Sequence, residues 1–152
     1  MRYYRAYIDG IDKTGKDLIC TYVSELSNHK YLVKPRGIIS MMAYSKIYNR
    51  EYVYDLEKEK DVLNVLLTVN YEDWKVRCKL NKEKDVTNDD YDYHSSTFKS
   101  YYDLLKHHDF PTLIYNTSEL TPYNIAKDIV KHLDMMNGEL YAWYFSLWHG
   151  SF

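Results

Sequence analysis

The apolar residues of this chain fall into two kinds of pattern that alternate along the sequence. Short apolar or weakly alternating runs predict strands, and runs whose apolar positions recur three or four residues apart predict helices. The strand patterns cover Arg2–Ile8, Tyr31–Val33, Val62–Val69 and Thr112–Tyr115. The helix patterns cover Lys16–Ser27, Ile38–Arg50, Asn70–Leu80, Tyr93–His108 and a last segment that starts at Pro122, after Thr121 as its cap, and ends at Gly138.

Helices between successive strands predict how those strands pair. Strands that are joined through a helix run parallel, because the chain has to return to the same end of the sheet. Val62–Val69 is the most apolar and β-branched run and is expected to be the central strand. We therefore expect an α/β fold of three layers, with a small, mainly parallel sheet of about four strands and helices on both faces.

Two segments do not fit this alternation. Residues 81–92 have no apolar period and combine Lys82 and Lys84 with several acidic residues, as a mobile lid or a plain surface loop would. Residues 138–152 are rich in aromatic side chains, which are expected to pack on the core or on a second subunit of a homodimer. The predicted organisation is one domain over residues 1–137, with a lid at about 81–92, and an aromatic extension over 138–152.

The strongest candidate for chemistry lies between the first strand and the first helix. Gly10, Gly15 and Lys16 fit the pattern G-x-x-x-x-G-K, in which backbone N–H groups surround a phosphate and the lysine neutralises its charge. The helix that starts near Lys16 would direct the positive end of its dipole at the same anion. An ordinary glycine turn can match this pattern, but the strand–loop–helix context favours a phosphate-binding loop.

A second candidate follows the second strand. Lys34-Pro35-Arg36-Gly37 forms a turn that leaves Arg36 at a strand's carboxyl end, on the same edge as the phosphate loop. An arginine there can donate two hydrogen bonds to a phosphate, whereas an arginine in a plain surface loop would have no such role.

Composition limits the classes of partner and compartment. The net charge of −2 gives no footprint for nonspecific nucleic-acid binding, so a nucleic-acid role would need a local patch. Cys20 and Cys78 are too few for a disulfide framework or a cysteine metal site, which favours a reduced, intracellular protein. No apolar run approaches the roughly 18 residues of a membrane span, and no signal peptide is visible, so we expect a cytoplasmic protein that does not enter membranes.

Several spaced motifs resemble those of thymidylate kinases and related deoxynucleoside monophosphate kinases. The run Asp9-Gly10-Ile11-Asp12-Lys13-Thr14-Gly15-Lys16 is similar to the family's E-G-x-D-x-x-G-K loop. The run from Arg36 to Tyr44 resembles its D-R-x-x-x-S-x-x-A-Y element, with Ser40 in the matching place. The strand ending at Val69 with its helix to Arg77, and the strand followed by Asn116-Thr117-Ser118, resemble two further family elements.

The resemblance implies ATP-dependent phosphoryl transfer to a nucleoside monophosphate, with Mg²⁺ bridging the donor phosphates. It places the ATP phosphates against Gly10, Ile11, Asp12, Lys13, Thr14, Gly15, Lys16 and Asp17, and the adenine beside Asn116, Thr117 and Ser118. It implies that Lys16, Arg36, Asp12 and Arg77 act in catalysis, with Lys82 and Lys84 as the lid's positive charges. The acceptor nucleotide would contact Asp12, Arg36, Ser40 and Tyr44.

Three departures from the family pattern leave other classes open. Asp17 stands where a hydroxyl usually binds the magnesium, Pro35 replaces the aspartate before the arginine, and only Asn28–Lys30 separates the first helix from the second strand. In the family, that interval holds much of the acceptor pocket. A weakly active or inactive relative that binds a nucleotide or a protein partner is one alternative, and a kinase for a nucleoside or a polynucleotide 5′ end is another. A compact chain with abundant tyrosine and lysine would suit an AT-rich bacteriophage genome, with the host cytoplasm as its location.

Overall fold

The computed structural model describes residues 3–11, 13–51, 61–80, 88–107 and 111–138. Within these ranges each strand is followed by a helix, and two successive helices separate the third strand from the fourth, as the sequence predicts. The strands are β1 (Arg5–Gly10), β2 (Leu32–Pro35), β3 (Val62–Thr68) and β4 (Thr112–Asn116). The helices are α1 (Lys16–Leu26), α2 (Ile38–Ile47), α3 (Tyr71–Leu80), α4 (Asn88–His107) and α5 (Pro122–Met136).

The four described strands form one parallel sheet in the order β2-β1-β3-β4. β3 is bordered by a strand on each side, and all its residues from Val62 to Leu67 are buried. This confirms the expected central strand, whose apolar run is needed because both of its faces are covered. The carboxyl ends of β1 and β3 meet at one edge, where Gly10 pairs with Leu67.

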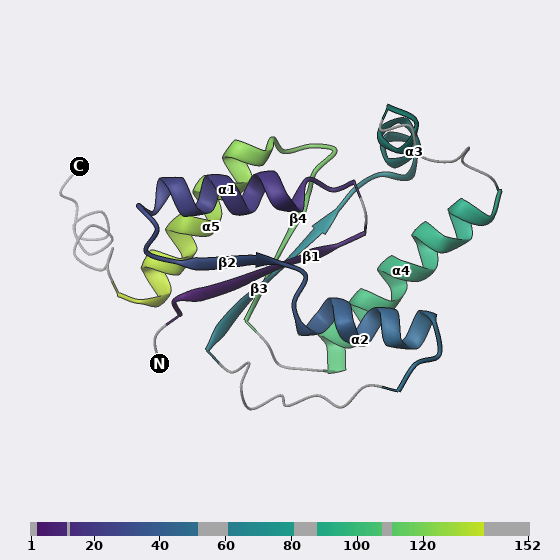
Figure 1. Cartoon of the computed structure of the whole chain (residues 1–152), viewed down its shortest axis with the longest axis horizontal. Coiled ribbons are helices and arrows are strands. Elements are labelled where there is room, and N and C mark those ends of the chain that lie inside the picture. The colour runs from purple at the N-terminus through teal and green to yellow at the C-terminus, as the bar shows by residue number, and fades with distance from the viewer. Residues whose placement is uncertain (1–2, 12, 52–60, 81–87, 108–110, 139–152) are drawn as a thin grey trace, which may run out of the picture.

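Helices cover both faces of the sheet, as Figure 1 shows. Successive side chains of a strand point to opposite faces, so Ala6 and Ile8 of β1 pack with α1 and α5, and Leu66 of β3 packs with α2 and α4. α1 contacts α5 and α2 contacts α4 along the outside of the two layers. The expected three-layer α/β/α architecture is therefore confirmed.

Two expectations about α4 were wrong. The helix begins at Asn88 and not at Tyr93. Its beginning extends away from the sheet (Figure 1), and Tyr91 and Asp92 there are exposed, so this part needs no apolar period. Tyr102 is 41% exposed and not part of the buried stripe, whereas Thr97 is buried. The direction in which a helix faces depends on the sheet and on α2, and spacing within α4 does not contain that information.

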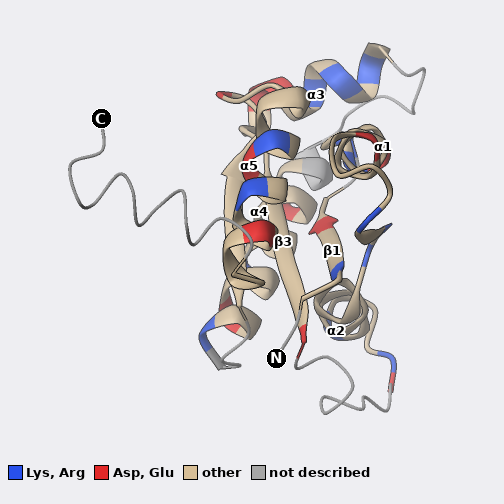
Figure 2. Ribbon diagram, turned by 90° about the vertical axis from the view of Figure 1, so that its left-hand side faces the viewer, with Lys and Arg blue, Asp and Glu red and all other residues tan. Residues whose placement is uncertain are grey.

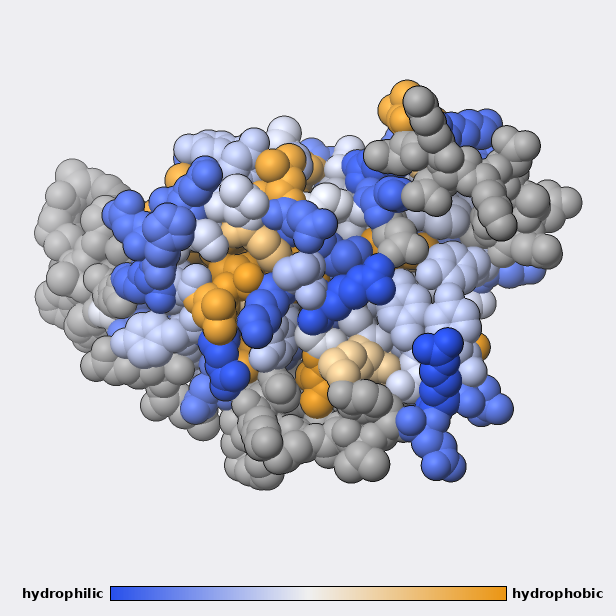
Figure 3. All heavy atoms as spheres, in the orientation of Figure 1, coloured by the Kyte–Doolittle hydropathy of each residue, from blue (hydrophilic) through white to orange (hydrophobic). Residues whose placement is uncertain are grey.

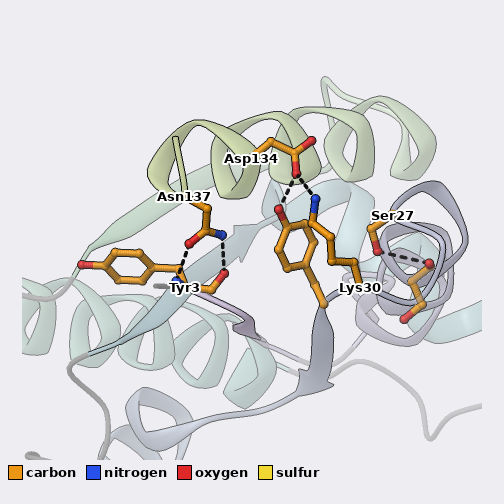
Figure 4. A network of polar contacts seen from close by, with 7 residues as sticks. Tyr3, Ser27, Lys30, Asp134 and Asn137 are labelled. Carbon is orange, nitrogen blue, oxygen red and sulfur yellow. Dashed lines mark hydrogen bonds and ion pairs between the residues drawn. The ribbon is translucent and has the colours of Figure 1, made fainter. Parts of the chain in front are cut away.

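The end of the molecule opposite the phosphate loop is fastened by polar side chains at the C-terminal end of α5 (Figure 4). The Asn137 amide accepts a bond from the Tyr3 N–H at 2.7 Å and donates one to the Tyr3 carbonyl at 2.9 Å. Asp134 accepts a hydrogen bond from the Tyr31 hydroxyl and forms an ion pair with Lys30 at 3.3 Å. These contacts connect the last helix to the beginnings of β1 and β2.

The part of the chain that the structure describes contains no helix that could cross a membrane. Within the described ranges, every helix is too short or too polar to span a bilayer. On the face seen in Figure 3, the hydrophobic side chains that the structure describes form small, separate groups among hydrophilic ones. The extension at 139–152 lies outside the described residues, so the domain boundary and the homodimer stay predictions.

Candidate functional site

The predicted phosphate loop joins the carboxyl end of β1 to the start of α1. Its backbone is tightly curved, with positive φ angles of 150° at Gly10, 65° at Lys13 and 86° at Gly15. Gly10 also lies so close to β3 that a Cβ atom there would be 2.6 Å from the Leu67 carbonyl oxygen. Both glycines of the motif are therefore explained by local geometry, while Asp12 lies outside the described residues.

Lys16 is buried at the centre of this loop. Its Nζ donates to the Gly10 carbonyl at 2.9 Å, to the Ile11 carbonyl at 2.7 Å and to the Thr14 hydroxyl at 3.3 Å. A buried ammonium needs such partners, and here they come from the loop itself. The loop therefore holds a positive charge at the N-terminus of α1, where the helix dipole also favours an anion.

Asp9 connects the phosphate loop to α2. Its Oδ1 accepts a hydrogen bond from the backbone N–H of Gly37 at 2.8 Å and one from that of Ser40 at 3.1 Å. A side chain of β1 therefore caps the N-terminus of α2. Its Oδ2 is buried without a hydrogen-bond partner. Burial raises the pKa of the Asp9 carboxyl above its usual value, against the opposing effect of the bonds from Ser40 and Gly37. The loop motif includes Asp9 only as its first residue and does not predict its contact with α2, because those partners lie about 30 residues away.

The predicted acceptor residues lie along α2 and beside α4. Ser40 Oγ and the Tyr101 hydroxyl are 2.7 Å apart, and the Tyr101 hydroxyl also donates to the Gly10 carbonyl at 3.4 Å. The Arg36 guanidinium lies over the Tyr44 ring, 5.4 Å from its centroid. Arg36 has a φ of 66°, a conformation that non-glycine residues rarely adopt outside functional or tight segments. The structure thus brings Arg36, Ser40 and Tyr44 to the side of the loop that faces α2.

The predicted adenine-side residues lie on the other side of the phosphate loop. Arg77 of α3 donates to the Lys13 carbonyl at 3.1 Å, to the Thr117 hydroxyl at 2.9 Å and to the Thr117 carbonyl at 2.9 Å. Asn116 and Ser118 each bond to Asn70, which precedes α3. Figure 2 shows several basic residues in α3, the helix that contains Arg77. The Arg77 side chain fastens the phosphate loop to the loop after β4, and Lys82 and Lys84 lie outside the described residues.

His94 is a further buried polar residue near this edge that no sequence pattern singled out. Its Nε2 lies 2.9 Å from the Val69 carbonyl, and its ring packs between Trp74 and Phe98. Burial lowers the pKa of His94, although the bond to Val69 opposes this effect. The neutral ring with Nε2–H as the donor therefore fits the site. An open groove of about 680 Å³, on the outer face of α4 beside Tyr71, includes this residue.

The described residues hold no preformed metal cluster. No three His, Cys, Asp or Glu side chains come together there in a way that could bind a metal ion. Asp17 is exposed in the first turn of α1, next to Lys16. Mg²⁺ in phosphoryl-transfer sites commonly uses one or two carboxylates together with substrate phosphates and water, so this single carboxylate fits that mode of binding.

Comparison with known proteins supports the fold. No protein-family model matches the sequence, and no curated protein matches it. Among solved structures, the chain is similar to the YorR protein of Bacillus subtilis, whose crystal structure is a complex with phosphorylated GDP. The two chains are 15% identical, with a TM-score of 0.73, over 87% of this chain and 96% of YorR. At this identity the similarity shows a shared fold.

Proposed function

We propose that the protein is an ATP-dependent nucleotide kinase, similar to thymidylate kinases, that transfers the γ-phosphoryl group to a nucleoside monophosphate. The observation that supports this most strongly is the buried ammonium of Lys16, held by Gly10, Ile11 and Thr14 at the N-terminus of α1. Phosphoryl transfer depends on positioning and on neutralising phosphate charge, and this arrangement provides both. The similarity in fold to a protein that was crystallised with a phosphorylated nucleotide agrees with this proposal.

Each side of the loop has its own role in this proposal. Lys16 and the loop backbone bind the β- and γ-phosphates, and the Asn116–Ser118 segment borders the adenine. On the α2 side, Arg36 binds the acceptor phosphate while Ser40 and Tyr44 line the acceptor site. Asp17 would hold Mg²⁺, which when bound neutralises charge on the donor phosphates. In the reaction, the bond between the γ-phosphorus and the bridging oxygen of ATP breaks as an acceptor phosphate oxygen bonds to that phosphorus.

Calorimetric titration with ATP and Mg²⁺ tests the donor site. Lys16→Ala is expected to weaken binding about tenfold or more, because a charge-assisted contact to phosphate is lost. Lys127→Ala, which removes an exposed lysine from α5, is the matched control and should bind like the wild type. An acceptor screen of the nucleoside and deoxynucleoside monophosphates, with product separation, then identifies the substrate. Absence of Mg²⁺-dependent ATP binding by the folded wild type would overturn the proposal.

A further inference from the structure

A row of stacked side chains runs along α2 from the end of β2 to the segment that follows the helix. The rings of Tyr44 and Tyr48 are nearly parallel, with an interplanar angle of 12° and centroids 6.0 Å apart. Arg36 covers Tyr44, and the Arg50 guanidinium lies 5.2 Å from the Tyr48 centroid. We call these four residues, Arg36, Tyr44, Tyr48 and Arg50, the stacking row.

The inner end of the stacking row is held in place by the candidate site. The Tyr44 ring meets the buried Tyr101 ring edge to face, at 6.5 Å and 87°, and the Tyr44 hydroxyl lies 3.4 Å from that of Tyr93. Tyr101 is in turn bonded to Ser40 and to the Gly10 carbonyl of the phosphate loop. The position of Tyr44 is therefore determined before any ligand arrives.

The outer end of the stacking row faces solvent. Tyr48 is 52% exposed, and Arg50 is exposed at the segment that follows α2. In Figure 1, α2 follows β2 directly and lies beside α4, so the row starts where β2 ends. A monophosphate acceptor contains one base and one phosphate, which Tyr44 and Arg36 would accommodate. Tyr48 and Arg50 provide a second ring and a second positive charge, which lie beyond the reach of a ligand with one base and one phosphate.

Two stacked tyrosine rings with a guanidinium group at each end have the chemistry that binds single-stranded nucleic acid. Bases stack on tyrosine rings whatever their sequence, and arginines bind the phosphates between them or stack on the bases. Although the chain has a net charge of −2, the stacking row is a local patch with two positive charges. We propose that the stacking row binds a single-stranded oligonucleotide whose terminal nucleotide enters the acceptor side of the phosphate loop. This binding goes beyond the proposed function, and it does not require phosphoryl transfer.

Fluorescence anisotropy with a 3′-labelled decathymidylate, without ATP, measures this binding directly. Tyr48→Ala is expected to weaken it about fivefold or more, and Tyr48→Phe to retain it, because stacking needs only the ring. Tyr123→Ala is the matched control, since Tyr123 is also about half exposed, at 48%, and also lies under a cation, Lys127, but on α5. Arg50→Ala is expected to reduce the slope of log affinity against log salt by about 0.7, the value for one phosphate contact on a single strand.

The same experiment distinguishes this inference from the nucleotide-kinase proposal. Lys16→Ala is expected to weaken ATP binding much more than decathymidylate binding, and Tyr48→Ala to do the reverse. Thymidine monophosphate should compete with decathymidylate, because it occupies Arg36 and Tyr44. The inference is overturned if the wild type binds Mg²⁺-ATP but not decathymidylate at low salt. Equal effects of Tyr48→Ala and Tyr123→Ala on decathymidylate affinity would overturn it as well.

Discussion

At the scale of single residues, the most unusual feature is a buried carboxyl group that has no cation bonded to it. Asp9 is 1% exposed, and its Oδ1 accepts hydrogen bonds from the N-terminus of α2, while its Oδ2 has no hydrogen-bond partner. Its burial raises its pKa, so its ionised form is disfavoured in the folded protein. Burying this carboxyl group costs free energy. Its hydrogen bonds nevertheless have a structural role, because they join the phosphate loop to the helix that follows Arg36.

Asp9→Asn is predicted to change how stability depends on pH. Because the folded-state pKa is raised above the unfolded value of 3.8, the contribution of Asp9 is fully present below that value and is lost as pH rises through the raised pKa. The wild type should therefore lose stability relative to Asp9→Asn across this window, by up to about 1.4 kcal/mol per pH unit. Urea unfolding of both proteins from about pH 4 to about pH 8 measures the difference. A difference that does not vary with pH would contradict the prediction.

At the scale of secondary-structure elements, the candidate site is a junction of loops and helix ends. The predicted phosphate loop is contiguous in sequence and is spaced as its motif requires, so its place between a strand and a helix could be predicted from local pattern alone. The bonds from Arg77 to Lys13 and Thr117 join residues 64 and 40 positions apart, and no local pattern reports them. The sequence predicted Arg77 as a functional residue, but only the structure connects its guanidinium to both loops.

Arg77→Lys is predicted to loosen this junction. Lysine keeps the charge but cannot reproduce the planar fork that reaches Lys13 and Thr117 together. We expect a loss of about 1–3 kcal/mol in the free energy of unfolding, in line with hydrogen bonds to a charged donor, and weaker ATP binding. Lys79→Ala, on an exposed face of the same helix, should change neither quantity. Urea unfolding and calorimetry on both variants provide the test. If Arg77→Lys has the stability and the ATP affinity of the wild type, Arg77 does not hold the two loops together.

At the scale of the whole molecule, the two ends of the sheet have different roles. The carboxyl ends of β1, β2 and β4 carry the candidate site, while Tyr3, Asp134 and Asn137 fasten the opposite end. Between them, Asn64 in the amino half of β3 is 1% exposed, and both polar atoms of its side chain lack hydrogen-bond partners. An unsatisfied buried amide is costly, and nothing among the described residues around it explains it.

Asn64→Leu is predicted to stabilise the protein as a whole. Removing the unpaired amide and filling the same space with an apolar side chain should raise the free energy of unfolding by about 1–2 kcal/mol. Asn64→Ala removes the same polar atoms but leaves a cavity, so it should gain less than the leucine variant or lose stability. ATP affinity should not change, because Asn64 lies away from the site edge. Lower stability of the leucine variant would indicate that the amide has a partner in solution.

The amino-acid sequence by itself determined the class of fold, the parallel sheet and the place of the G-x-x-x-x-G-K motif between the first strand and the first helix. These depend on local periodicity and on short motifs, because hydrophobic spacing sets which residues can form each strand or helix. The tertiary structure decided the strand order, the face on which α4 packs and the cap that Asp9 places on α2. It also decided the partners of Arg77 and the stacking row, because these contacts join elements that packing brings together. Such contacts depend on how the layers pack against one another, and the local pattern of a single segment does not contain that information.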